Sequence, residues 1–249
     1  MRILSPSWKR HNICTTHKYI NSVKYVVCED QADSYRSKGL DIIVCPNKEQ
    51  GNVSRVRNWI LNKFIPSDDI VIVDDDMSYF GYFSGNKHKK INSTDVHSFL
   101  NYGFNLAKEF NCKYWGLNLN NDKGSYREYS PFSLKSVLLG PFGGFIKGFD
   151  CRYDEKLPLK EDYDLSIQAL NKYRKILRVN FVHYVCKQHT NEGGCASYRT
   201  INREKKQLLL LQKKWGKSIV KEDTTKKKNS NKVKTFDINP VIKVPIGGI

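Results

Sequence analysis

The chain has 249 residues, enough for one domain with a full hydrophobic core, and no apolar run approaches the roughly 20 residues that a membrane span needs. Met1–Pro6 lacks the apolar stretch of a secretory signal, and the 7 cysteines include no Cys-x-x-Cys pair, which disfavours a disulfide framework and a structural zinc site. We therefore expect a cytoplasmic protein with buried, reduced thiols, and its net charge of +17 favours a polyanionic partner such as nucleic acid, a nucleotide or an anionic membrane.

Short apolar runs rich in β-branched residues alternate with helical patterns in the first third of the chain. This alternation predicts a mainly parallel sheet with crossover helices. Apolar residues at helical spacing predict one of these helices from Val53 to Phe64. The expected strands are Arg2–Leu4, Tyr25–Cys28, Asp41–Cys45 and Ile70–Val73.

The second half of the chain has the pattern of a mixed α+β region, with helices expected after Thr94, from about Glu161 to Tyr173, and at Ile201–Trp215. We expect a single domain over residues 1–215, with a nucleotide-binding half (1–77) and an acceptor and catalytic half (78–215), followed by a basic tail (216–249). Within the tail, Lys221–Lys234 lacks the apolar residues that would order it. Further strands are expected at Tyr114–Leu119, Val137–Leu139, Gly144–Lys147 and Ile176–Val182.

Three carboxylates, Asp74, Asp75 and Asp76, come directly after the buried strand Ile70–Val73. Ligands of open parallel sheets bind outside the carboxyl ends of the strands. Adjacent carboxylates repel one another unless a cation neutralises them, and hard oxygen ligands suit the Mg²⁺ or Mn²⁺ that holds a diphosphate. Alternation along an extended segment predicts Asp74 and Asp76 on one side and Asp75 on the other. The alternative is a solvated acidic loop.

Two arginines lie on the helix that precedes this strand. A rotation of about 100° per residue places Arg57 beside the apolar stripe and Arg55 nearly opposite. Arg57 is therefore expected to point inward, where a guanidinium needs an anionic partner. The sequence leaves three partners open: nucleotide phosphates, the Asp cluster (Asp74, Asp75 and Asp76), and a structural carboxylate.

Glycines and acids mark two further positions. Leu139–Phe145 places three glycines around a turn, which allows close approach to a ligand, although an ordinary hairpin turn explains it equally well. Glu161 and Asp162 open a helix, where a carboxylate stays ionised and can act as a general base; simple stabilisation of the helix is the alternative. Later in the chain, His189 lies in a polar loop and is a candidate metal or phosphate ligand.

In this order, the features resemble the four shared elements of GT-A glycosyltransferases: Asp74–Asp76, Gly140–Gly144, Lys160–Asp162 and His189. The resemblance covers roughly residues 1–200 and implies a GT-A-like α/β fold, with a mixed, mainly parallel central sheet flanked by helices. It also implies that Asp76, with Asp74 or His189, holds Mn²⁺ or Mg²⁺ on the donor diphosphate, and that Asp162, with Glu161 beside it, is the base if the reaction inverts the anomeric centre. The implied nucleotide-sugar contacts are Ser5, Pro6, Glu29, Arg55, Arg57, Asp74, Asp75, Gly143 and Gly144.

Four segments, Gly51–Asn58, Val73–Met77, Lys160–Asp164 and Glu192–Cys195, look more narrowly like the phage TET-associated glycosyltransferases, which resemble the base J glucosyltransferases. That likeness implies transfer of a sugar from a UDP-sugar to the hydroxymethyl group of a modified pyrimidine in DNA, with 5-hydroxymethylcytosine the first candidate, in the cytoplasm of an infected host. The basic charge agrees with a DNA acceptor. The DNA contacts expected are Lys87, Lys89, Lys90 and Arg199.

Two other functions fit parts of the same pattern. One is a GT-A glycosyltransferase acting on a polysaccharide or a lipid-linked acceptor, and the other is a nucleic-acid-binding protein with an inactive site. The sequence leaves open the sugar, glucose or arabinose among them, the choice between inversion and retention, the modified base, whether that base is flipped, and the oligomeric state.

Overall fold

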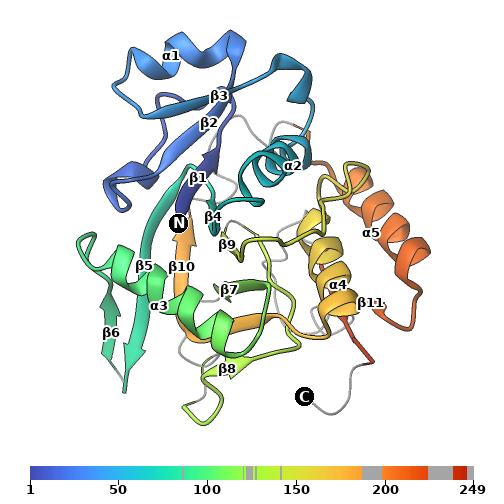
Figure 1. The fold of residues 1–249 in the computed structure, drawn as a ribbon. Coiled ribbons are helices and arrows are strands. Elements are labelled where there is room, and N and C mark those ends of the chain that lie inside the picture. The colour runs from blue at the N-terminus through green and yellow to red at the C-terminus, as the bar shows by residue number, and fades with distance from the viewer. Residues whose placement is uncertain are drawn as a thin grey trace, which may run out of the picture.

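The computed structural model describes residues 1–85, 87–119, 121, 126, 128–140, 142–186, 198–223 and 238–245. Their main feature is a ten-stranded sheet flanked by helices (Figure 1). The strand order is β3-β2-β1-β4-β9-β7-β10-β5-β6, and β8 pairs with β10 outside this path. The expected α/β fold with a mainly parallel core is confirmed.

The N-terminal half supplies the parallel strands β1 (Arg2–Pro6), β2 (Lys24–Cys28), β3 (Ile42–Cys45) and β4 (Ile70–Val73). Between them lie α1 (Ala32–Arg36), α2 (Val53–Phe64) and the 3-10 turns η1 (Thr16–Lys18), η2 (Glu29–Gln31) and η3 (Asn47–Glu49). Because parallel strands end at the same edge of the sheet, the residues that follow β1 and β4 lie close together.

The second half extends the sheet with antiparallel pairings, in which β9 runs antiparallel to both β4 and β7 and β5 forms a hairpin with β6. Its strands are β5 (Met77–Ser84), β6 (Lys87–Lys90), β7 (Tyr114–Asn118), β8 (Phe132–Ser133), β9 (Phe142–Phe145) and β10 (Leu177–Cys186). Its helices are α3 (Val96–Glu109), α4 (Glu161–Tyr173) and α5 (Ile201–Trp215), and β11 (Val220–Glu222) pairs with β12 (Pro240–Ile242) in a small second sheet.

The two faces of the central sheet bury separate apolar clusters. Along β4, Val71 and Val73 join the cluster under α3, whereas Ile70 and Ile72 join the cluster under α2 and α4. This alternation follows from the two-residue period of a strand. All four residues are at most 3% exposed, so β4 is held from both faces and gives Asp74, the next residue, a rigid base.

Helix α5 lies outside α4 (Figure 1) and is attached to it through buried polar groups. Asp164, fully buried on α4, accepts a hydrogen bond from Trp215 Nε1 at 2.7 Å and pairs with Lys214 at 2.9 Å. Lys160 pairs with Glu204, and both side chains are 1% exposed. A buried carboxylate is tolerated only with such partners, so these contacts fix the C-terminal helix to the body.

The observed limits of the helices and strands can be compared with those predicted from the sequence. The predicted limits of α4 and α5 are confirmed to the residue. Val137–Leu139 is not a strand, because the described structure gives it no ladder partner, and β9 begins two residues before the predicted Gly144. Lys221 belongs to β11, so the unstructured stretch expected from Lys221 does not begin there, and residues 224–237 lie outside the described part.

Two expectations from composition concern the thiols and the membrane. Six cysteines fall within the described residues; all are free thiols and only Cys186 is not buried. Cys195 lies outside the described residues. Among the described helices, none combines the length and apolar character that crossing a membrane requires.

Candidate active site

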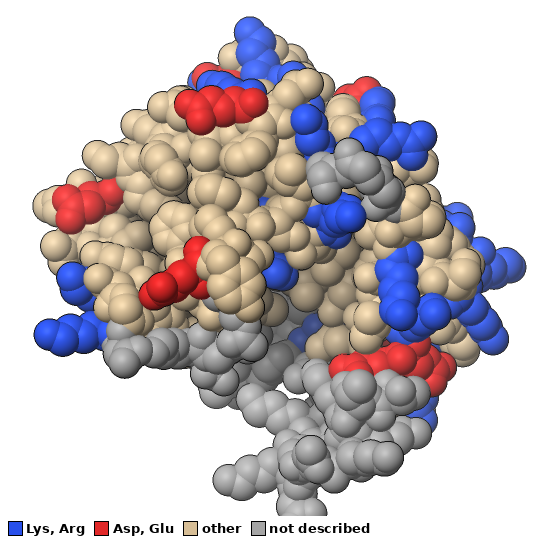
Figure 2. All heavy atoms as spheres, turned by 90° about the horizontal axis from the view of Figure 1, so that it is seen from below, with Lys and Arg blue, Asp and Glu red and all other residues tan. Residues whose placement is uncertain are grey.

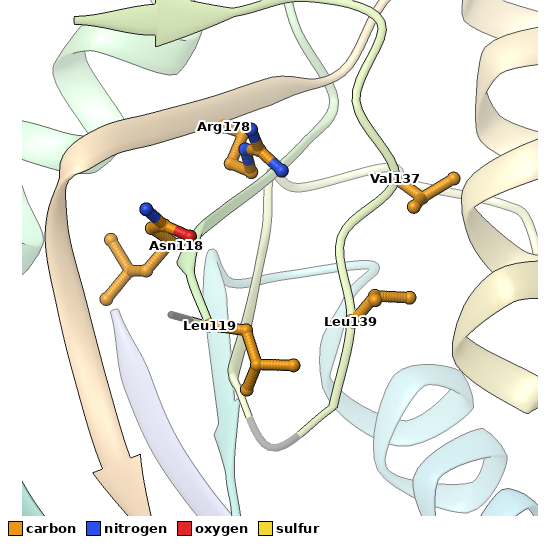
Figure 3. Close-up of a pocket in the computed structure, with 6 residues that line it drawn as sticks. Asn118, Leu119, Val137, Leu139 and Arg178 are labelled. Atoms are coloured by element: carbon orange, nitrogen blue, oxygen red, sulfur yellow. The ribbon is translucent and has the colours of Figure 1, made fainter. Parts of the chain in front are cut away.

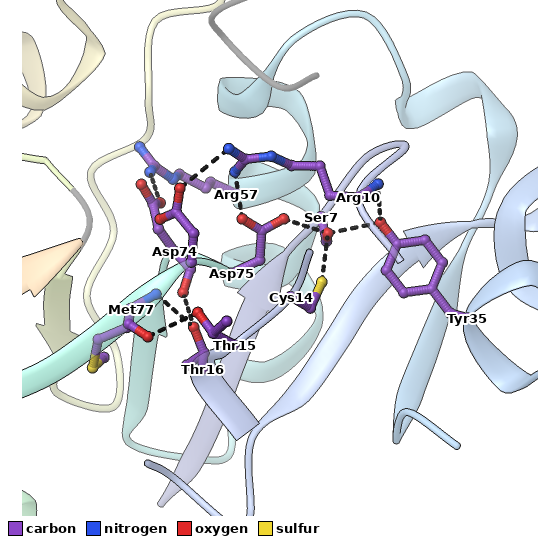
Figure 4. Close-up of polar contacts among 11 residues, drawn as sticks. Ser7, Arg10, Cys14, Thr15, Thr16, Tyr35, Arg57, Asp74, Asp75 and Met77 are labelled. Atoms are coloured by element: carbon purple, nitrogen blue, oxygen red, sulfur yellow. Dashed lines mark hydrogen bonds and ion pairs between the residues drawn. The ribbon is translucent and has the colours of Figure 1, made fainter. Parts of the chain in front are cut away.

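The Asp cluster lies where the chain leaves β4, beside the loop that follows β1 (Figure 4). Arg10, in that loop, binds two of the three carboxylates, with Nη1 at 2.5 Å from Asp75 Oδ1 and Nη2 at 3.1 Å from Asp76 Oδ2. Ser7 donates a hydrogen bond to Asp75 and contacts the Tyr35 hydroxyl at 2.7 Å. Three adjacent carboxylates require nearby positive charge, and Arg10 of the same chain supplies part of it.

Asp75 is the most buried member of the cluster, at 2% exposure. Burial raises the pKa of its carboxyl to about 7, although the Arg10 guanidinium and the Ser7 hydroxyl favour the charged form. Asp76 is 4% exposed, whereas the Asp74 side chain is 34% exposed. The predicted alternation is only partly confirmed, because Asp75 turns away toward Ser7 but Asp76 shares Arg10 with it.

Hydrogen bonds between Thr15 and Thr16, at the start of η1, and the backbone of residues 74–77 fix the path of the Asp cluster. Thr16 Oγ1 donates to the Asp74 carbonyl at 2.6 Å and accepts from the Met77 amide at 3.1 Å. Thr15 Oγ1 donates to the Met77 carbonyl at 3.0 Å, and its amide donates to the Asp75 carbonyl at 2.9 Å. The carboxylates therefore project from a tightly held turn rather than from a solvated loop.

Arg57 connects the Asp cluster to α4. Its guanidinium lies 3.0 Å from Asp74 Oδ1 and 3.0 Å from Glu161 Oε1, and its side chain is 5% exposed. The inward direction predicted for Arg57 is confirmed, and both carboxylate partners are now identified. Arg55 points outward, 3.5 Å from Glu155, as the helical geometry predicts. The helix that carries both arginines is capped at its N-terminus by Asn52, whose side chain accepts from the Arg55 amide at 3.1 Å.

The first turn of α4 presents two acids in different surroundings. Glu161 is 8% exposed, and burial, with a smaller contribution from the nearby Asp162 charge, raises its pKa to about 8. Asp162 is half-buried and accepts from the Gly140 amide at 2.8 Å and from the Tyr163 amide at 2.8 Å. Gly140 has φ +68, a conformation that favours glycine, so the turn before β9 is shaped to reach the Asp162 carboxylate.

Gly143 and Gly144 do not lie in a turn, which corrects the expectation of a glycine loop around a ligand. Both are inside β9, paired with Ile72 and Val71 of β4. A Cβ on Gly144 would lie 2.1 Å from the Trp115 indole nitrogen. The absence of a side chain at Gly144 therefore leaves room for the buried Trp115 indole.

With this geometry established, comparisons with known proteins identify the family. The family model described as TET-Associated Glycosyltransferase matches residues 1–194, more than half of the chain. The chain belongs to the TET-associated glycosyltransferase family. It is accordingly a glycosyltransferase, as the motif order predicts.

Solved structures agree with the fold of this TET-associated glycosyltransferase. S. aureus TarS 1–349 in complex with UDP-GlcNAc is 15% identical with a TM-score of 0.50, over 85% of this chain and 67% of that one. A second structure of S. aureus TarS 1–349, for which no ligand is named, is 15% identical, with a TM-score of 0.47, and the match covers 74% of this chain. This chain spans 59% of the length of that TarS chain. The first likeness supports the GT-A-like fold alone. No curated protein matches the chain in sequence.

Three of the expected nucleotide-sugar contacts lie on or directly after β1 and β2. Ser5 is fully buried within β1, Pro6 is half-buried at its end, and Glu29 is exposed and accepts from the Asn47 amide at 3.1 Å. Ser7 and Arg10, which the sequence did not single out, contact the Asp cluster. The sequence signal for them was weak: one hydroxyl and one of many basic residues in the loop after the first strand.

The oxygen atoms of Asp74 and Asp76 suit a hard divalent cation, which commonly takes one or two carboxylates together with substrate phosphates. Within the described part of the chain, no group of three or more His, Cys, Asp or Glu side chains is placed to hold a metal by itself. His189, the other predicted ligand, lies outside the described residues. Asp74 and Asp76 therefore fit a metal that is shared with a bound diphosphate.

The predicted DNA contacts divide into two groups. Lys87, Lys89 and Lys90 are exposed along β6, which forms a hairpin with β5. Arg199 instead pairs with the buried Glu204 at 2.8 Å. The sequence reading missed a second basic surface on α5, where Figure 2 shows Lys and Arg gathered toward the side on which α5 lies. Its exposed members are Arg203, Lys205, Lys206, Lys213 and Lys214, of which Lys214 pairs with Asp154 and Asp164.

Proposed function

We propose that this TET-associated glycosyltransferase moves a sugar from a UDP-sugar to the hydroxymethyl group of a modified pyrimidine in DNA, with 5-hydroxymethylcytosine as the first candidate. The observation that carries the proposal is the family match, together with the ion-paired arrangement of the Asp cluster, Arg57 and the first turn of α4. Such an acceptor would be met in the cytoplasm of an infected host.

The donor would bind at the carboxyl ends of β1 and β4. The bound UDP-GlcNAc in the TarS structure supports a UDP-sugar as the donor class. Asp74, with its partly exposed side chain, and Asp76 would hold Mn²⁺ or Mg²⁺, which when bound neutralises the diphosphate. Asp75 would position the cluster through Ser7 and Arg10, because its own carboxylate is buried. Arg57 would place its charge beside the same phosphates.

Asp162 would accept the proton of the acceptor hydroxyl. Two backbone N–H groups hold its carboxylate, and each oxygen keeps a further lone pair for the incoming proton. The acceptor oxygen forms a bond to C1 of the sugar as the bond from C1 to the diphosphate oxygen breaks. The diphosphate leaves with the electron pair, and the configuration at C1 is inverted.

The acceptor strand would follow the basic surfaces. Exposed lysines on β6 and the exposed basic residues of α5 carry charge suited to phosphate contacts. The basic residues of β6 and of α5 both belong to the acceptor and catalytic half, for which we propose residues 78–215. We propose residues 1–77 as the nucleotide-binding half and residues 216–249 as a basic tail.

The test of catalysis compares Asp162→Asn with Asp33→Asn, whose side chain is 98% exposed on α1. Sugar transfer to DNA should fall by about 10²–10⁴-fold for Asp162→Asn, the range attributed to a positioned general base, and stay unchanged for Asp33→Asn. Retention of wild-type transfer by Asp162→Asn would contradict the assignment. Sugar transfer that persists without a divalent metal would contradict the proposed metal dependence but would leave the role of Asp162 as the base intact.

A further inference from the structure

A pocket of about 310 Å³ opens beside the carboxyl end of β7 (Figure 3). One side is formed by β7 and the residue that follows it, and the other by the segment that leads into β9. Arg178, from β10, closes a third side. The lining residues are Leu117, Asn118, Leu119, Val137, Leu139 and Arg178.

Arg178 is unusual because it is a half-buried cation without a carboxylate partner among the residues described. Its Nε donates to the Asn180 side-chain oxygen at 2.7 Å, an amide that offsets none of its charge. Burial lowers the pKa of Arg178, and no neighbouring acid opposes this shift. Every other buried guanidinium or ammonium discussed above pairs with a carboxylate. A desolvated guanidinium of this kind favours a ligand that brings hydrogen-bond acceptors into the pocket.

The other walls of the pocket are apolar and disfavour a phosphate group as the ligand. Leu117, Leu119, Val137 and Leu139 are apolar, and removing a strongly hydrated anion from water against such walls is costly. A flat heteroaromatic ring fits better, because its faces are apolar while its edge carries carbonyl oxygens. Pockets with apolar walls and a few polar groups are typical of such ligands. Leu119, although apolar, is 40% exposed in the described structure, as expected for a wall that a ligand covers.

The pocket lies near the proposed base. Leu139 precedes Gly140, whose amide donates to Asp162 at 2.8 Å. The strands β4 and β7 lie on either side of β9, so their carboxyl ends, at Asp74 and Asn118, are separated by roughly 10 Å, twice the spacing between neighbouring strands. A ring in the pocket would therefore have a substituent within reach of the space between Asp162 and the Asp cluster.

We propose that this pocket receives the pyrimidine ring of the acceptor, unstacked from the DNA, with Arg178 donating hydrogen bonds to a ring carbonyl oxygen. The inference rests on the proposed function. A pocket walled on three sides cannot surround a base that is still paired and stacked, so the nucleotide must rotate out of the duplex before transfer.

The test uses duplex DNA with one hydroxymethylated pyrimidine next to 2-aminopurine, whose fluorescence rises when its neighbour unstacks. Arg178→Gln removes the guanidinium, and Leu119→Trp fills the pocket from its exposed wall. Arg174→Gln is the matched control, an exposed arginine four residues earlier. The measurements are kcat/KM for DNA, Kd for the UDP-sugar and the fluorescence change on DNA binding.

We expect Arg178→Gln and Leu119→Trp each to lose at least tenfold in kcat/KM for DNA and to lose the fluorescence rise, while donor Kd stays within twofold and Arg174→Gln behaves as wild type. Wild-type transfer by both pocket variants would overturn the inference and leave the proposed function intact. So would a parallel loss of donor affinity in Arg178→Gln, which would mark Arg178 as a donor-phosphate residue. Absence of transfer by the wild-type protein to any DNA would overturn the proposed function, and the inference with it.

Discussion

Replacing Arg57 with glutamine should destabilise the protein well beyond the loss of a surface charge. The Arg57 side chain is 5% exposed and bridges Asp74 and Glu161 at 3.0 Å each. Removing one partner of a buried ion pair costs about 3–5 kcal/mol, because the remaining charge stays buried. Asp74 is 34% exposed and can be hydrated, so the lower end of that range, about 3 kcal/mol, is expected. At about 2–4 °C per kcal/mol for a chain of this size, Tm should fall by about 6–12 °C.

The matched control is Arg55→Gln, two residues earlier on the same helix. Arg55 is 37% exposed and lies 3.5 Å from Glu155, a surface pair for which about 0–1 kcal/mol is expected. Calorimetric scans of the two variants should therefore differ by several degrees. The Arg57→Gln deficit should also be larger at pH 9 than at pH 6, because the pKa of Glu161 is raised to about 8 and its carboxyl is neutral at the lower pH. Equal Tm values for the two variants would refute the bridging role of Arg57.

Three further predictions test other parts of the structure. Burial raises the pKa of Asp75 to about 7, so the stability of the neutral carboxyl is complete below its unfolded pKa of about 3.9 and is lost as the pH rises through 7; Asp75→Asn, which stays neutral, should therefore gain stability relative to wild type between pH 5 and pH 8, and an unchanged difference would contradict this. Gly144→Ala should cost about 1–3 kcal/mol in chemical denaturation through its clash with Trp115, and Trp115→Phe in the same chain should recover part of that loss; no recovery would argue against the contact. Glutamines at three exposed lysines of β6 should reduce the slope of log K for DNA against log salt by up to about 3, whereas glutamines at Lys18, Lys24 and Lys38 should not; equal slopes would remove β6 from the DNA surface.

The elements that the sequence predicted well are those whose signal is local. The apolar strand before Asp74 and the start of α4 at Glu161 follow from patterns of a few residues, a continuous apolar run in one case and acids before a helical period in the other. The direction of Arg57 also follows locally, since a helix fixes the angle between Arg57 and its apolar neighbours.

The features that the sequence did not predict depend on residues far apart in the chain. Arg10 binds acids 65 and 66 positions away, and nothing near Arg10 indicates them. Gly144 lies in a strand that pairs with β4 and β7, and the indole of the distant Trp115 fills the space that a side chain at Gly144 would need. Val137–Leu139 has strand-like residues but no neighbouring strand to pair with, and it forms one wall of the pocket beside Arg178.

The proposed function is transfer of a sugar to a modified base in DNA. The most direct measurement incubates the protein with Mn²⁺ or Mg²⁺, a panel of UDP-sugars and DNA containing cytosine, 5-hydroxymethylcytosine or 5-hydroxymethyluracil, followed by mass spectrometry of the released nucleosides. We predict a mass gain of one sugar on a single hydroxymethylated nucleoside, absent with Asp76→Ala. Release of UDP with no gain on any nucleoside would contradict the DNA acceptor, and would direct the search to a polysaccharide or lipid-linked acceptor instead.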